Sequence, residues 1–186
     1  MDAHISRLLT GVRTCRCCGA SFRELLNLDF DRPGICPLDL PVLDNSALLG
    51  EFGDVLTQDF CRLDESRFIR GQLVLPIRSA GAELVLGIWV QLSPDAFEHH
   101  VTASLMGGEE ALEAMEGWLA NPLPVNDEGP VACLAHLAPG AERPEFQITE
   151  ADHPLTDLQQ DEMPIDSVFE WLHAFGHDVG SLIFDA

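Results

Sequence analysis

The chain has 186 residues, 46% of them hydrophobic, which is enough for one ordinary domain with a real apolar core. It carries 31 acidic residues against ten Lys and Arg together, all ten of them arginine, and the formal net charge is −21. The missing lysine excludes a P-loop lysine, a Schiff base and a lysine general base. The acidity argues against a sequence-independent nucleic-acid binder, which needs a basic surface.

The charge is distributed unevenly along the chain. Residues 1–80 hold nine Arg and 11 acidic residues, a balance of 9 − 11 = −2. Residues 81–186 hold 20 acidic residues and a single arginine, Arg143, a balance of 1 − 20 = −19. Such an acidic half either keeps the protein soluble or attracts a basic partner, and both interpretations stay open at this point.

No targeting or membrane-spanning segment is expected. Residues 1–14 are amphipathic and lack the apolar core of a signal peptide. The longest apolar run, over residues 83–91, has the length of a strand rather than the roughly 18 residues of a membrane span. We therefore expect a cytoplasmic protein without a membrane partner, whose six cysteines are thiols or metal ligands before disulfides.

The first half of the chain predicts a helix, a loop, a short helix and a β-hairpin. These fall at residues 4–12, at the proline-rich residues 29–44, at residues 47–56, and at residues 67–78 and 83–93. The two hairpin runs are rich in β-branched and apolar residues and are separated by a short loop with a glycine. Pro76 lies inside the first run, which indicates a sheet edge or a bulge.

The second half predicts further helices and strands. Helices are expected at residues 96–103 and 108–119, and strands at residues 131–137 and 145–150. The helix over 108–119 would place Met115, Trp118 and Leu119 on one face. We predict an α+β fold in a single domain, 1–186, with a mostly antiparallel sheet and helices packed on it. Residues 1–45 would carry a cysteine knuckle and residues 46–186 the core.

The last helix has the clearest signals. Ser167 to Glu170 is a capping-box pattern, and Gly176 suits the C-terminal cap. The apolar residues between them follow helical spacing and form one stripe, made of Val168, Trp171, Leu172 and Phe175.

The cysteine cluster near the N-terminus is the first candidate site. Cys15 and Cys18 form a C-x-x-C step before Gly19, as in a zinc-knuckle turn. Two further ligands would be needed, and the candidates are Cys36, Cys61, Cys17 or a histidine. Inert thiols and a redox dithiol are the alternatives, although no strand precedes the pair as in thioredoxin-type sites. Cys133 lies in an apolar strand and is expected in the core.

A second candidate site combines three residues with no known catalytic signature around them. Arg70 begins a buried strand and needs an anionic partner, in a structural salt bridge or in a substrate site. His153 precedes a proline and is held extended, and Asp152 is a candidate cap for the following turn. In an enzyme, the arginine would bind an anionic small molecule while the histidine exchanges a proton.

Several strings together resemble a bacterial family of uncharacterised proteins, the domain-of-unknown-function family 2199. They are Cys15-x-x-Cys18-Gly19, Asp59-Phe-Cys61, Phe68-Ile-Arg-Gly71, Pro76, Gly87-Ile-Trp-Val-Gln-Leu-Ser93, Gly117-Trp-Leu119, Arg143-Pro144 and Asp152-His-Pro-Leu155. The resemblance covers roughly residues 15–175 and implies a small mixed α/β domain with no established activity. It favours Cys61 over Cys17 as a metal ligand. Members often carry a histidine after the cysteine pair, which residues 19–23 lack, so Cys36 is the expected fourth ligand.

Size and charge lead to one expected function and one alternative. We expect a non-enzymatic, acidic binding protein that sequesters a basic protein partner, as immunity proteins do, with a structural zinc on Cys15, Cys18, Cys36 and Cys61. The alternative is an enzyme that uses Arg70, Asp152 and His153.

Overall fold

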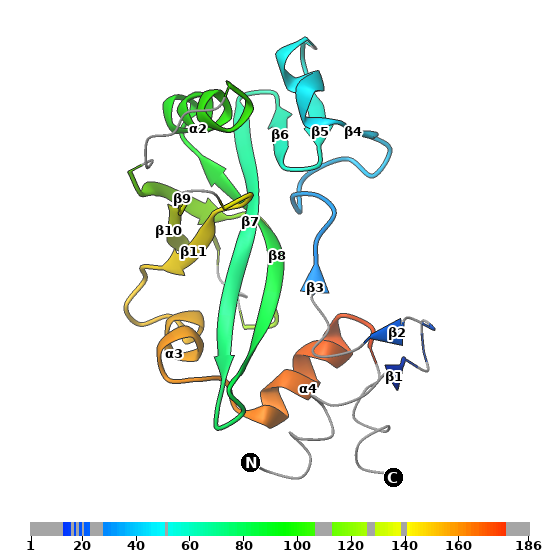
Figure 1. Ribbon diagram of the computed structural model, residues 1–186, viewed down its shortest axis with the longest axis vertical. Coiled ribbons are helices and arrows are strands. Elements are labelled where there is room, and N and C mark those ends of the chain that lie inside the picture. The colour runs from blue at the N-terminus through cyan, green and yellow to red at the C-terminus, as the bar shows by residue number, and fades with distance from the viewer. Residues whose placement is uncertain are drawn as a thin grey trace. The chain divides into compact units, whose positions relative to one another are not determined.

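A computed structural model describes most of the chain, shown in Figure 1. The described residues are 13–15, 17, 19, 21–22, 28–50, 52–106, 113–125, 129–138 and 141–177. The helix expected at residues 4–12 lies outside them. The chain divides into two compact units. Unit 1 comprises the described residues within Met1–Leu28, Val74–Leu86 and Asp152–Ala186, and unit 2 those within Asp29–Leu73 and Gly87–Ala151. The single domain stays a prediction.

The described elements confirm the α+β class. The strands are β1 (Arg13–Thr14), β2 (Ser21–Phe22), β3 (Leu28–Asp29), β4 (Val42–Leu43), β5 (Val55–Thr57), β6 (Phe60–Leu63), β7 (Ser66–Ile77), β8 (Ala82–Leu92), β9 (Met115–Leu119), β10 (Ala132–His136) and β11 (Glu145–Ile148). The helices are the 3-10 helix η1 (Asn45–Leu49) and α2 (Pro94–Met106), α3 (Pro154–Gln160) and α4 (Ile165–Ala174). None of the described helices is long and apolar enough to cross a membrane.

The sheet is barrel-like. Its strand order is β3-β8-β9-β10-β11-β7-β6-β5-β4, and β7 also pairs with β8, so that β7 to β11 form a closed ring of pairings. The pairs β5–β6, β6–β7, β8–β9, β9–β10 and β10–β11 are antiparallel, whereas β4–β5 and β7–β11 are parallel. A separate two-stranded sheet joins β1 and β2. The mostly antiparallel sheet is as predicted.

The predicted hairpin is present as β7 and β8. Its proline, Pro76, lies near the end of β7, where Met163 is the neighbouring residue. Met163 forms an isolated parallel bridge to Ile77 rather than a paired strand. Its N–H donates to the Pro76 carbonyl at 2.6 Å, and Arg78 donates to the Met163 carbonyl at 3.0 Å. Among the described residues, Pro76 therefore lies at a sheet edge, where a residue without an N–H is tolerated.

The helix expected at residues 108–119 is wrong over its described part, which is strand β9. Met115, Gly117 and Leu119 are buried and the residues between them are exposed, the two-residue period of a half-buried strand. A Cβ on Gly117 would lie 2.5 Å from Val90 Cγ1, so the glycine permits β8 and β9 to pack closely. Over this short run the spacing of the apolar residues fits a helix as well as a strand, and pairing with the neighbouring strands determines that the run is a strand.

Two other expectations need correction. The helix expected at residues 47–56 is a 3-10 turn at Asn45–Leu49 followed by strand β5, and β6 and α3 were not anticipated. Helix α4 begins at Ile165 after an N-cap at Pro164, so Ser167 lies inside it and does not form a capping box. The buried stripe of Val168, Trp171 and Leu172 is confirmed, as is Gly176 with φ +81° beyond the helix end.

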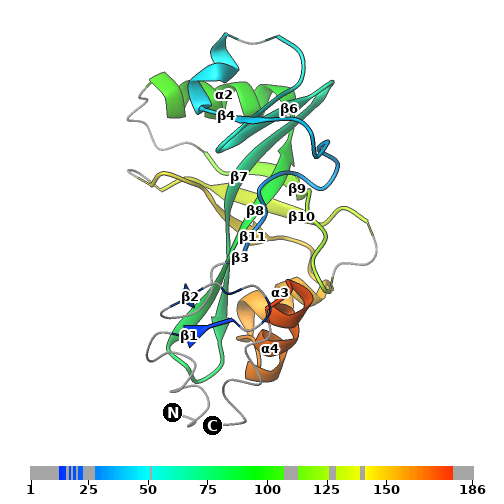
Figure 2. The same ribbon diagram turned by 90° about the vertical axis from the view of Figure 1, so that its right-hand side faces the viewer.

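The helices pack on the sheet in separate places. In unit 2, α2 lies beside β6, where the Phe97 and Phe60 rings meet edge to face with centroids 6.2 Å apart. The helix expected at residues 96–103 is confirmed and extends over Pro94–Met106, with Ser93 Oγ accepting a hydrogen bond from Ala96 N at 3.3 Å. In unit 1, α3 and α4 lie next to the tip of the β7–β8 hairpin, as both ribbon views show (Figure 2).

Candidate functional site

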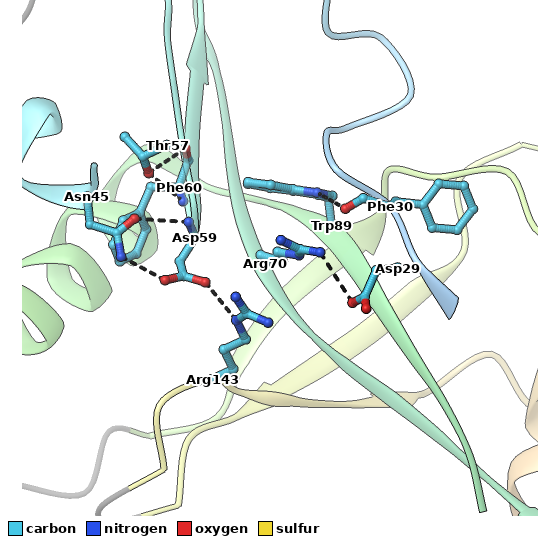
Figure 3. Close-up of polar contacts among 9 residues, drawn as sticks. All are labelled: Asp29, Phe30, Asn45, Thr57, Asp59, Phe60, Arg70, Trp89 and Arg143. Carbon is cyan, nitrogen blue, oxygen red and sulfur yellow. Dashed lines mark hydrogen bonds and ion pairs between the residues drawn. The ribbon is translucent and has the colours of Figure 1, made fainter. Parts of the chain in front are cut away.

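Arg70 on β7 finds the anionic partner that its position predicts. Its Nη2 donates to Asp29 Oδ1 at 3.2 Å (Figure 3), and the arginine side chain is 14% exposed against 47% for the aspartate. The Nε atom is buried without a hydrogen-bond partner. A Cβ on Gly87 would collide with the Asp29 carboxylate, so this glycine on β8 leaves the room that the ion pair occupies.

A second ion pair in unit 2 joins the start of β6 to the segment before β11. Arg143 Nε donates to Asp59 Oδ1 at 2.7 Å, while Asn45 Nδ2 donates to Asp59 Oδ2 at 2.7 Å (Figure 3). Asn45 Oδ1 accepts from the Asp59 backbone N–H at 3.0 Å. Both carboxylate oxygens are thus engaged, and the group ties η1, β6 and β11 together rather than presenting a base to a substrate.

The loop after β3 is fixed to the sheet by a buried tryptophan. Trp89 is fully buried on β8, and its Nε1 donates to the Phe30 carbonyl at 3.0 Å. Asn121 accepts from Trp89 N at 2.7 Å and donates to the Arg32 carbonyl at 2.8 Å. These bonds satisfy buried polar groups and hold the first residues of the proline-rich loop in place.

The three residues of the alternative enzyme site lie in different units. Arg70 belongs to unit 2, and Asp152 and His153 belong to unit 1. His153 is extended, as predicted, but it is itself the N-cap of α3, because its Nδ1 accepts from Leu155 N at 3.1 Å. The capping role expected of Asp152 is therefore wrong. The three-residue pocket stays a prediction.

Of the predicted N-terminal knuckle, only Cys15, Cys17 and Gly19 are among the described residues, so the knuckle stays a prediction. Gly19 N donates to the Cys15 carbonyl at 2.9 Å, and Gly19 has φ +72°. The sulfurs of Cys15 and Cys17 are 2.9 Å apart, and Cys17 donates to the Gly176 carbonyl. Cys18 lies outside the described residues.

Cys36 and Cys61 meet in the core of unit 2. They belong to one buried cluster, and the two thiols interact with each other there. Burial raises the pKa of both thiols, and it raises the pKa of Cys133, a core residue as predicted, to about 12. No three metal-binding side chains converge within the described part of the chain, so the four-cysteine zinc site stays a prediction.

One buried titratable residue escaped the sequence reasoning. His100 on α2 is 3% exposed and its Nδ1 has no hydrogen-bond partner. Its ring lies 5.9 Å from the Phe60 ring, centroid to centroid. Burial, and secondarily His99, lower its pKa to about 4. The signal was present in the sequence, since His100 falls on the same helical face as Phe97 and Val101, both buried.

A small cavity opens beside the proline-rich loop of unit 2. It has a volume of about 310 Å³, and its walls include Ile35, Phe68, Gln91, Asn121 and Pro130. Because the Asn121 side chain is already bonded to Trp89 and Arg32, the lining presents mainly apolar atoms. The space therefore suits an apolar side chain or small apolar group rather than an ionic one.

Large exposed apolar side chains are concentrated in one stretch of chain. Among the described residues these are Ile35, Leu38, Val42, Leu43, Leu49, Phe52 and Trp118. All but Trp118 fall within residues 35–52, which we call the apolar segment. It runs from the loop after β3 through β4 to the end of η1, at the edge strand of the sheet (Figure 1). Sequence reasoning predicted a loop over residues 29–44 and a helix over residues 47–56, and it did not predict that these apolar side chains are exposed.

Comparison with known proteins identifies the family. No curated protein and no solved structure is significantly similar to this chain. The family DUF2199, described as an uncharacterized protein conserved in bacteria, matches residues 14–163, most of the chain. The chain therefore belongs to the DUF2199 family of uncharacterized bacterial proteins, as its sequence motifs indicated.

Proposed function

We propose that this protein is a non-enzymatic binding protein that sequesters a basic protein partner, in the manner of an immunity protein. The observation that carries the proposal is the balance of −19 over residues 81–186. A surface of one charge sign accelerates encounter with a partner of the opposite sign and disfavours other partners.

The exposure of the carboxylates supports this proposal. Every described acidic side chain after residue 81 is exposed. The single arginine of this half, Arg143, is engaged by Asp59 from the other half. The carboxylates of the described residues in this half are therefore available at the surface, and Arg143 does not neutralise them.

The proposal is tested by native mass spectrometry of the untagged protein isolated from its host, followed by binding kinetics. We expect a complex with a basic protein, whose association rate falls at least tenfold as salt rises from low to physiological levels. Replacing Glu142 and Glu145 with Gln should lower that rate more than replacing Asp64 with Asn and Glu65 with Gln, a matched loss of two charges. A partner whose association rate ignores salt would refute the proposal.

We also propose a structural zinc ion, because Cys36 and Cys61 lie in one buried cluster and would supply two of its four ligands as thiolates. The same mass measurement should show one zinc per chain, lost when both residues become serine and kept in the control Cys133→Ser. A metal-free mass for the gently isolated protein would refute the site.

A further inference from the structure

We propose that the apolar segment, residues 35–52, is the docking surface for a basic amphipathic segment of the protein partner. This inference rests on the proposed function and names where the partner binds. The acidic half would accelerate encounter, and the apolar segment would provide the contact that slows dissociation.

The exposure of the segment is unusual for a surface without a partner. Phe52 is 98% exposed, Leu38 is 88% exposed and Ile35 is 67% exposed. Single exposed apolar residues are ordinary, but a concentration of large ones marks an interaction surface. The rest of the described chain exposes only one large apolar residue of this kind, Trp118, at 45%.

The first part of the segment is anchored to the core of unit 2 by two kinds of contact. Arg32 donates to the carbonyls of Pro37 and Leu40, and these hydrogen bonds stabilise the conformation of the loop. Leu40 packs on the buried cluster that contains Cys36. Exposed groups fixed by such anchors lose little conformational entropy on binding, which favours affinity.

The charge around the segment selects a basic partner. Residues 31–54 hold five acidic residues and one arginine, a balance of 1 − 5 = −4. Asp31, Asp39, Asp44 and Asp54 are exposed among the apolar side chains. The Arg32 guanidinium donates to backbone carbonyls of the loop, and its positive charge is already included in this balance. A surface of apolar groups among carboxylates complements a partner segment that has one apolar face and one basic face.

Side chains rather than backbone pairing would supply the contact. Strand β4 is the last in the sheet order, but it has only two residues, too few for an added strand to gain much. The cavity beside Ile35 offers the better anchor, since its volume of about 310 Å³ can receive one large apolar side chain. A buried anchor surrounded by a charged rim is the usual anatomy of a tight interface.

The probe is a synthetic 14-residue peptide of leucine and lysine with one apolar and one basic face. A control peptide has every leucine replaced by serine and keeps the same charge. We expect the wild-type protein to bind the leucine peptide at least tenfold more tightly than the serine peptide, with hydrogen-exchange protection within residues 35–52. The double variant Leu38→Ser/Phe52→Ser should lose this preference at least tenfold while binding the serine peptide as before.

The matched control is Trp118→Ser, which removes an exposed apolar residue outside the segment and should leave both affinities unchanged. Thermal unfolding of each variant verifies that the fold is retained. An equal loss in Trp118→Ser, or an unchanged preference in the double variant, overturns the docking surface. Equal, salt-sensitive binding of both peptides also overturns the docking surface but leaves the proposed function standing. If neither peptide binds, the docking surface and the proposed function are both contradicted.

Discussion

Acid sensitivity should arise from one buried histidine. His100 is enclosed by Phe60 and the body of α2, and its pKa of about 4 lies well below the unfolded value of 6.5. The unfolded chain therefore binds a proton between these values that the folded chain does not bind. Stability contributed by the neutral ring is complete above pH 6.5 and is lost as the pH falls.

The magnitude follows from the two pKa values. Linkage between 6.5 and about 4 gives a loss of about 2 kcal/mol by pH 5 and about 3 kcal/mol by pH 4. The charge of Asp59 favours the protonated ring, and other groups of the chain also contribute to the pH dependence of stability. The quantity to measure is therefore the difference between two proteins rather than one curve.

The assay is urea unfolding at pH 7, 6, 5 and 4 for the wild type and for His100→Leu. Leucine removes the titration and also the buried Nδ1 that lacks a partner, so the variant should be at least as stable at pH 7 and relatively more stable by about 2–3 kcal/mol near pH 4–5. His99→Gln removes only the smaller cause of the shift and should retain most of the wild-type pH dependence, because burial of His100 is the larger cause. Parallel curves for wild type and His100→Leu would show that the ring is accessible to protons in the folded state.

Three further outcomes follow from the packing of unit 2. Gly71→Ala places a Cβ 2.5 Å from both the Phe146 ring and a carbonyl oxygen, so chemical denaturation should show a loss of about 1–3 kcal/mol; an unchanged midpoint would contradict the close packing. A double-mutant cycle with Asp59→Asn and Arg143→Met should give a coupling of about 1 kcal/mol, because the pair is only partly buried. Cys61, whose pKa is raised by burial, should react with iodoacetamide at least a hundredfold more slowly than in urea, as read by peptide mass mapping.

The elements with long, consistent patterns were predictable. The β7–β8 hairpin extends over strands of 12 and 11 residues, which are rich in β-branched and apolar residues and are separated by a short loop with a glycine. Strand β9 has five residues, and there the same apolar residues fit either period. Its assignment depends on pairing with β8 and β10, partners that a local pattern does not contain.

The candidate site residues show the same difference between what a local sequence pattern predicts and what depends on the tertiary fold. Burial of Arg70 required a carboxylate, and the physical argument predicted that partner without identifying it as Asp29, 41 positions earlier in the chain. Asp59 and Arg143 were separate motif residues in the sequence, and only the fold brings them together. Exposure of the apolar segment was not predictable, since proline-rich loops carry apolar residues whether or not the fold covers them.

Several residues that carry the family resemblance have packing roles in unit 2. Gly71 and Gly87 leave room for a neighbouring ring and a carboxylate, Trp89 fixes a loop, and Asp59 and Arg143 close a cluster. None of these side chains combines exposure with an unused acid, base or nucleophile in the way a reaction centre requires. Recognition of a partner places different demands on a chain, namely fixed exposed groups of complementary charge and apolarity. These demands are met by residues outside the motifs, in the apolar segment and in the acidic half, which is why the search for function belongs on the surface.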